Sequence, residues 1–207
     1  VSVVNGPLIE RYCKAYPRVR LFVHEGISDL VGETLVDGEL DMALMFSTRT
    51  RLRNASVNIL ATEEMVLASA PSAAPAKSQL TMSDLSSLPL VLYRLPNYIR
   101  WRVDVAFQQL GVQPRVTSET NTLSMLLELA RRGVGSAILP RSSVEQDVSL
   151  NLLTAIPIRG MSVNWALAIS RDREHSLAVQ MLIRNIEELV LEQIKAGKWQ
   201  ATLQVSR

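Results

Sequence analysis

Apolar positions near the N-terminus change between helical and strand-like spacing. Over residues 8–16 they recur at helical intervals, and Pro17 ends the run, which predicts a helix. Apolar side chains then occupy every second position over 19–23, which predicts a strand, and a second helix is predicted over 28–36. Residues 41–46 are almost continuously apolar, as in a strand buried on both faces. This order of elements predicts an α/β domain with a parallel sheet.

A Pro- and Ala-rich segment at 71–78 has the composition of a linker. A second set of α/β elements follows it. Near the C-terminus, apolar positions from Val179 to Ile194 form one continuous stripe, which predicts a long amphipathic helix. Strand-like runs occur at 59–69, 88–93, 112–118, 137–139 and 163–170, and Asn97 is positioned to cap a helix that ends at Gly111.

The order of these elements predicts two lobes, with a chain that enters the second lobe and then returns to the first. Lobe I is expected at 1–66 and 167–207, and lobe II at 67–166. The last helix needs a sheet to cover, so lobe I is incomplete without it. Two crossing strands, near 60–69 and 163–170, would connect the lobes.

Composition and charge narrow the class of protein. The chain has 207 residues, of which 47% are hydrophobic and 20% charged, as in a globular protein with one large core or two small ones. The formal net charge is +2 with both signs interspersed, so no basic stripe predicts direct contact with nucleic acid or an anionic membrane. The lone cysteine, Cys13, excludes an internal disulfide and a cysteine metal cluster, and it is expected to be a buried free thiol.

The segment ETNTLSMLLELARRGVGSAILP, residues 119–140, combines a polar beginning with an apolar run. Helical spacing predicts a buried face made of Leu123, Leu126, Leu127 and Ala130. Gly133 and Gly135 permit a tight exit from this helix and a close approach of the next strand.

Four short polar side chains crowd the start of this helix, namely Thr120, Asn121, Thr122 and Ser124. One capping residue satisfies one or two of the free amides there, and the remaining donors and the helix dipole favour an anion. Two interpretations stay open at this point. The residues are plain helix caps, or they belong to a cradle for a carboxylate or phosphate at the carboxyl end of a strand.

Five segments carry a resemblance to a known family. They are PLIERYCKAYPRVRLFVHEG, LVDGELDMALM, ATEEMVLASAP, TMSDLSSLPLVLY and LLELARRGVGSAILPRS. In this order they resemble the effector-binding domain of LysR-type transcriptional regulators, over nearly the whole chain. FVHEG, IRWRVDVAF and KWQ look most like the nitrogen assimilation control subgroup.

The resemblance implies a fold like that of type II periplasmic binding proteins. Two Rossmann-like α/β lobes would be joined by two crossover strands, with a small-molecule cleft between them. It also implies a winged helix-turn-helix and a linker helix that would precede this chain, bind DNA and dimerise. The helices at 8–16 and 121–132 are expected at the subunit interface.

The resemblance also implies which residues line the cleft. They are Ser2; Met45, Phe46 and Ser47; Tyr93, Arg94 and Asn97; and Thr120, Asn121 and Thr122. The position of Asn121 commonly contacts the anionic end of the effector in this family. Arg94, which follows a strand end, is the favoured arginine for an anion.

The resulting hypothesis is an effector-sensing and oligomerising domain of a cytoplasmic LysR-type regulator, with a role in nitrogen metabolism. Its expected effector is a small anionic metabolite, unless the protein has no effector. The other expected partners are DNA, through the N-terminal domain, further copies of the chain in a homodimer or homotetramer, and RNA polymerase. No cofactor, metal or membrane is expected. The alternative is a periplasmic-type solute-binding protein of the same fold.

An enzyme is disfavoured. His24 and His175 are far apart in sequence, and no nucleophile-elbow, phosphate-loop or metalloprotease motif occurs. Glu63 and Glu64 are expected to be an exposed pair on a strand and not a metal site.

Overall fold

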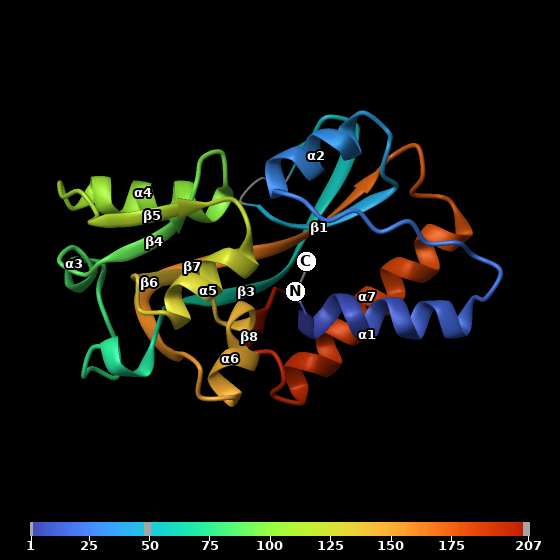
Figure 1. Ribbon diagram of the computed structural model, residues 1–207. Helices are drawn as coiled ribbons and strands as arrows, with labels where there is room; N and C mark the ends of the chain where they lie inside the picture. Colours follow the sequence, from blue (N-terminus) through green and yellow to red (C-terminus); the bar gives the residue numbers. More distant parts are fainter. Residues whose placement is uncertain (1, 48–50, 205–207) are drawn as a thin grey trace. The chain divides into compact units, whose positions relative to one another are not determined.

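The computed structural model describes residues 2–47 and 51–204, which divide into two compact units (Figure 1). Unit 1 consists of Val1–Glu63 with Asn164–Arg207, and unit 2 of Glu64–Val163. Two long strands, β3 and β7, run from one unit into the other. The division therefore falls within these strands and not at the Pro- and Ala-rich segment, where a single 3-10 turn begins at Pro71.

Unit 1 contains antiparallel strands with helices on both faces. Its elements are α1 (Ser2–Ala15), α2 (Ser28–Val36), β1 (Met42–Phe46), β2 (Arg51–Leu52), the first part of β3 (Ala55–Ser69), the last part of β7 (Thr154–Ser170), α7 (Leu177–Lys195) and β8 (Ala201–Leu203). β1 pairs with β7, and β2 and β8 pair with β3. α1 and α7 lie side by side (Figure 1).

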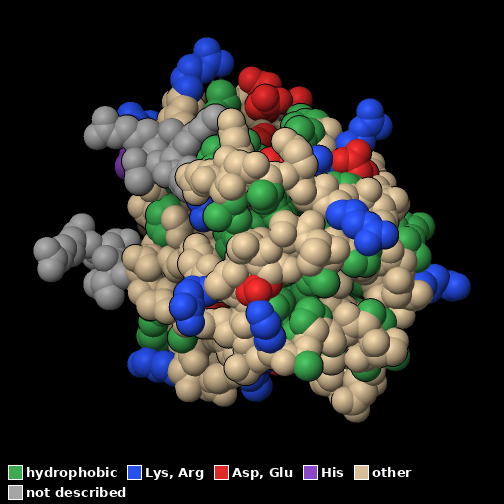
Figure 2. Space-filling view, turned by 90° about the vertical axis from the view of Figure 1, so that its left-hand side faces the viewer, with side chains coloured by type: hydrophobic (Ala, Val, Ile, Leu, Met, Phe, Trp, Pro, Cys, Tyr) green, Lys and Arg blue, Asp and Glu red, His purple; other side chains and the backbone are tan. Residues whose placement is uncertain are grey.

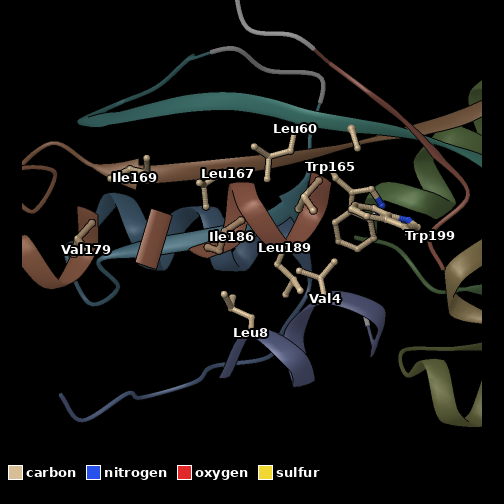
Figure 3. Packing of buried hydrophobic residues seen from close by; sticks show 12 residues of the cluster. Val4, Leu8, Leu60, Trp165, Leu167, Ile169, Val179, Ile186, Leu189 and Trp199 are labelled. Atoms are coloured by element: carbon tan, nitrogen blue, oxygen red, sulfur yellow. The ribbon is translucent and has the colours of Figure 1, made fainter. Parts of the chain in front are cut away.

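The alternation of side chains along β7 explains why helices cover both faces. Trp165, Leu167 and Ile169 pack into the cluster formed with α1 and α7 (Figure 3). The residues between them, Ala166 and Ala168, pack into the cluster formed with α2. The apolar stripe predicted for the last helix is confirmed, since it joins the first of these clusters.

Unit 2 contains the parallel strands. Its elements are the last part of β3, η1 (Pro71–Ala73), α3 (Met82–Leu85), β4 (Leu90–Tyr93), α4 (Tyr98–Gln109), β5 (Val116–Thr120), α5 (Leu123–Arg131), β6 (Ser136–Pro140), η2 (Arg141–Ser143), α6 (Glu145–Ser149) and the first part of β7. β4 pairs in parallel with β5 and β6, and β6 pairs antiparallel with β3. The strands and helices predicted in this region are confirmed with shifted ends. Helix α6 of unit 2 was not predicted, nor were the short strands β2 and β8 of unit 1.

The strand predicted at 19–23 is wrong. No strand includes these residues, and Phe22 is 80% and Val23 59% exposed. A strand needs a neighbour for its backbone hydrogen bonds, and in the described part of the chain no strand pairs with this segment. The parallel sheet predicted from the N-terminal rhythm is also wrong for unit 1, because β1 meets the returning β7 antiparallel.

Cys13 is exposed, so the prediction of a buried thiol is wrong. The core-facing position of this turn of α1 belongs to Tyr12, which is 1% exposed and donates a hydrogen bond from its hydroxyl to the Ala178 carbonyl oxygen at 2.8 Å. Successive residues of a helix point about 100° apart, so Cys13 is turned away from that face.

The acidic pair on β3 is divided between interior and solvent. Glu63 is 1% exposed and accepts a hydrogen bond from the Trp165 indole Nε1 at 2.7 Å, whereas Glu64 is exposed. The expectation of an exposed pair is therefore wrong for Glu63. Neighbours on a strand point to opposite faces, so the sequence EE places one carboxylate inside.

Glu63→Ala is expected to destabilise the protein by about 2 kcal/mol, because it leaves the buried Trp165 N–H without this acceptor. Glu64→Ala is the matched control and is expected to change stability by less than about 0.5 kcal/mol. Urea unfolding followed by circular dichroism measures both. Equal losses in the two variants would contradict the assignment of the buried hydrogen bond as the stabilising contact.

Candidate functional site

The carboxyl ends of two parallel strands in unit 2 place the predicted polar residues next to one another. Tyr93, the last residue of β4, is registered with Thr120, the last residue of β5. The chain stays paired just beyond the strand, since the Arg94 N–H donates to the Thr120 carbonyl oxygen at 2.8 Å. Helices α4 and α5 begin after these strands, so two helix N-termini follow one edge of the sheet. Such an edge is where open α/β sheets bind ligands.

Asn97 caps α4 as predicted. Its side-chain oxygen accepts from the N–H groups of Ile99, at 2.9 Å, and Arg100, at 3.1 Å. Tyr93 is 9% exposed, so most of its side chain belongs to the interior. The side-chain oxygen of Asn97 is therefore occupied by the N-terminus of α4.

The polar start of α5 has one cap and several unused groups. Thr122 is the N-cap, and its hydroxyl accepts from the Met125 N–H at 3.4 Å, a long hydrogen bond. Ser124 and Thr120 each contact Thr122 at 3.4 Å. The Asn121 side chain is exposed and has no hydrogen-bond partner in the described part of the chain. The cap thus explains Thr122, and Asn121 stays available to a ligand.

The arginines near this edge differ in how far protein partners engage them. Arg100 binds Asp104, Glu119 and the Tyr93 carbonyl oxygen. Burial disfavours its charged form, but the hydrogen bonds with Glu119 and Asp104 outweigh burial and raise the pKa of Arg100 above its ordinary value. Arg94 is exposed, and its guanidinium forms no ion pair within the described residues. Arg94 is therefore the cation at this edge whose charge is not neutralised.

The arginines at the C-terminal end of α5 are paired. Arg131 binds Asp147, which is 4% exposed, and Arg132 donates to Glu128 at 2.6 Å. The hydrogen bond with Asp147 raises the pKa of Arg131. Both therefore act within the fold, as their position in the last helical turn suggests.

The predicted unit 1 residues lie at the end of β1. Met45 is 6% exposed and packs into the cluster under α2, while the Phe46 ring lies 4.1 Å from that of Trp165 between centroids. The Ser47 N–H donates to the Asn164 carbonyl oxygen at 3.1 Å. Ser2 begins α1, and its side chain lies outside the described part of the structure.

Ser28 joins this group and was not predicted there. Ser28 is the first residue of α2, whose N-cap is Ile27 and whose N-terminus has no side-chain cap. The Ser28 hydroxyl accepts instead from the Phe46 N–H at 3.2 Å. The only sequence signal was a serine at a helix start, which is the usual signature of a cap, so the contact with β1 could not be read from it.

The buried face predicted for α5 is right for three of its four residues. Leu126, Leu127 and Ala130 are at most 8% exposed, but Leu123 is 37% and Met125 50% exposed. Leu123 is the first residue of α5, and the buried residues of this helix begin one turn later. Two exposed apolar side chains therefore accompany the polar helix start.

Among described residues, no group of three metal-ligating side chains occurs, and none of the helices is long and apolar enough to cross a membrane.

Comparison with known proteins gives the family. The model of the LysR substrate binding domain matches residues 4–190. The chain belongs to the LysR substrate-binding domain family. The edge formed by the ends of β4 and β5 and the starts of α4 and α5 is thus part of a LysR-type domain.

Two curated members of LysR-type regulator families are similar to this chain. One is HTH-type transcriptional regulator BbuR of Bordetella bronchiseptica, 25% identical over 201 residues, which are 96% of this chain and 62% of that protein. The other is the nitrogen assimilation regulatory protein nac of Escherichia coli, 25% identical over 142 residues, which are 69% of this chain and 46% of that protein. The chain thus spans less than two thirds of these relatives.

A solved regulatory domain shows the same fold. The regulatory domain of CcmR from Synechocystis PCC6803, in complex with 2-PG, has a TM-score of 0.79 at 14% sequence identity, covering 89% of this chain and 90% of that one. The α/β fold of LysR regulatory domains, which is of the type II periplasmic-binding-protein-like kind, is therefore confirmed.

Proposed function

We propose that this chain is the effector-sensing part of a LysR-type transcriptional regulator. Its family and its regulator relatives support this function over that of a periplasmic-type solute-binding protein, although the two share a fold. In the whole protein, an N-terminal domain would bind DNA, the chain would form a homodimer or homotetramer, and RNA polymerase would be a further partner. The nac relative supports a role in nitrogen metabolism, and such a regulator would act in the cytoplasm, without catalysis.

The effector is proposed to be a small organic anion held at the edge of unit 2. The observation that carries this proposal is the start of α5, where Asn121 is exposed and without a partner within the described residues, next to a helix N-terminus. Arg94 supplies a cation at the end of the neighbouring strand β4, where its N–H donates to the Thr120 carbonyl oxygen. Together they offer amide donors, a helix dipole and a guanidinium, which suit a carboxylate or phosphate.

Within unit 1, Ser28, Phe46 and Ser47 form a second group of candidate contacts at the end of β1. The serine hydroxyl of residue 28 fixes the Phe46 backbone, and the Phe46 ring is held by Trp165. Mechanistically, an effector that binds one conformation of the domain better than another shifts the equilibrium by that difference in affinity.

A thermal-shift screen of small carboxylates, phosphates and amino acids tests the proposal. A ligand at 100 times its dissociation constant is expected to stabilise the protein by about 2.7 kcal/mol. Asn121→Asp is expected to abolish this shift, because it adds a negative charge where an anion binds. Gln113→Ala, which removes another exposed amide of unit 2, is the control and should leave the shift unchanged. A ligand that stabilises wild type and Asn121→Asp equally would exclude this site.

A further inference from the structure

A concave site lies wholly within unit 2, beside α4. A cavity of about 230 Å³ opens between α4, the segment Arg159–Met161 of β7 and Met82 of α3. From α4 it is lined by Arg102, Val105, Ala106 and Gln109 among others, which share one helix face at i, i+3, i+4 and i+7 spacing. None of the residues proposed for the effector lines it, so this cavity is a different place on unit 2.

Two arginines carry the charge of this cavity, and neither is neutralised. Arg102 and Arg159 both line it, and neither forms an ion pair with any described carboxylate. Arg102 donates to the Ser162 carbonyl oxygen at 3.2 Å, and Arg159 donates to the Gln79 side-chain oxygen at 3.0 Å. These acceptors are neutral, so the positive charge of both side chains remains available.

Arg102 has a donor that the fold leaves unused. Its Nε is buried and has no hydrogen-bond partner in the described part of the chain. A buried N–H without an acceptor is costly, and most such groups in proteins are paired. In the described part of the chain the Arg102 guanidinium makes one hydrogen bond, to Ser162, so N–H groups of this side chain remain for an anion in the cavity.

The remaining wall sets the shape of the occupant. Met82, Val105, Ala106, Leu110 and Met161 give the cavity an apolar lining, and no acidic residue lines it. Asp104, the acidic residue of α4, is bound to Arg100 at 2.8 Å. On the face that Figure 2 shows, hydrophobic, Lys and Arg, and Asp and Glu side chains are interspersed. An inorganic ion would leave the apolar wall uncovered, and a neutral hydrocarbon would leave both guanidinium groups unpaired.

We infer that this cavity binds a small organic carboxylate whose apolar body packs on α4 and whose charged end is bound by Arg102 and Arg159. Bidentate pairing with a carboxylate is what the guanidinium fork favours. The same carboxylate chemistry could come from an acidic side chain of a second copy of the chain, and the experiment separates the two sources.

Phenylacetate is the probe, and it is titrated into the ¹⁵N-labelled chain while amide signals are followed by NMR. The largest shifts are expected at Ala106 and Gly160, with none for phenylacetamide, which has the same body without the charge. Arg159→Gln is expected to weaken binding about tenfold, because a charge-assisted hydrogen bond is lost. Arg115→Gln, an exposed arginine of unit 2 outside the cavity, should bind like wild type.

A second variant guards against misfolding. Arg102→Lys keeps the charge but loses the fork, so weaker binding with an intact spectrum supports the inference. Shifts confined to residues 120–124, an equal response to phenylacetamide, or unchanged affinity in Arg159→Gln would overturn it. So would a case in which phenylacetate does not bind but Arg159→Gln lowers the mass measured by light scattering, which would assign the arginines to a protein carboxylate.

Discussion

Gly135→Ala is expected to lower the stability of the protein by about 3 kcal/mol, with a fall in melting temperature of about 6–12 °C. A Cβ atom at this position would lie 2.8 Å from Thr117 Oγ1, 3.0 Å from the Pro89 carbonyl oxygen and 3.1 Å from the Leu90 carbonyl carbon. Two of these three atoms are backbone of the chain entering β4, and they cannot move without distorting the parallel pairing of β4 with β6.

The neighbours of Gly135 are themselves held in place. The Ser136 N–H donates to the Pro89 carbonyl oxygen at 2.8 Å, and the Thr117 hydroxyl donates to the Leu90 carbonyl oxygen at 3.0 Å. A methyl group would therefore break or lengthen these hydrogen bonds. Because β4 and β5 carry the proposed effector site at their ends, the variant is also expected to weaken effector binding.

Gly32→Ala is the matched control for this prediction. Gly32 is also buried and has no positive φ, but its added Cβ would meet the ends of flexible side chains, with Met45 Cε nearest at 3.3 Å. Alanine is favoured over glycine in a helix by about 1 kcal/mol, which offsets the crowding, so a change within about 1 kcal/mol is expected. Thermal unfolding followed by circular dichroism measures both, and equal losses would show that contact with the backbone is not the cause.

Periodicity predicted those elements whose apolar pattern is repeated over several turns or strand positions. The stripe on α7 and the alternation along β7 bury residues at each repeat, so the sequence states which face is inside. The run at 19–23 has the same alternation and forms no strand. Alternation states which side chains could share a face, but it does not provide the neighbouring strand that pairs with the backbone.

The candidate site was predicted in part for a similar reason. Caps are local, so Asn97 could be assigned from the residues that follow it, whereas four polar residues at the start of α5 left the identity of its cap open until the structure assigned Thr122. The contact of Ser28 with the Phe46 backbone joins residues 18 positions apart and depends on how α2 packs on β1. The cavity beside Arg102 and Arg159 depends in the same way on tertiary packing, because 57 positions separate the two arginines. No local sequence pattern predicts this cavity.

Trp199→Ala is expected to destabilise the protein by about 4 kcal/mol, the second large effect. Trp199 is 1% exposed and lies in the cluster under α1 and α7, with its ring centroid 6.0 Å from that of Trp165 in an edge-on arrangement (Figure 3). It follows the end of α7 and precedes β8, so it fastens this C-terminal segment to the core. Removing the ring would leave a cavity that the surrounding strands cannot close.

Trp199→Phe separates the ring from its polar group. The Trp199 Nε1 is buried and has no hydrogen-bond partner within residues 2–47 and 51–204, so phenylalanine removes an unpaired donor while it keeps an aromatic ring. A loss of no more than about 1.5 kcal/mol is expected, well below that of alanine. Urea unfolding measures the two variants, and a loss in Trp199→Phe as large as in Trp199→Ala would mean that a single aromatic ring does not replace the packing of the indole. Trp165 packs against both Trp199 and Phe46, so loss of the Trp199 ring is also expected to loosen the packing of Phe46, a proposed effector contact.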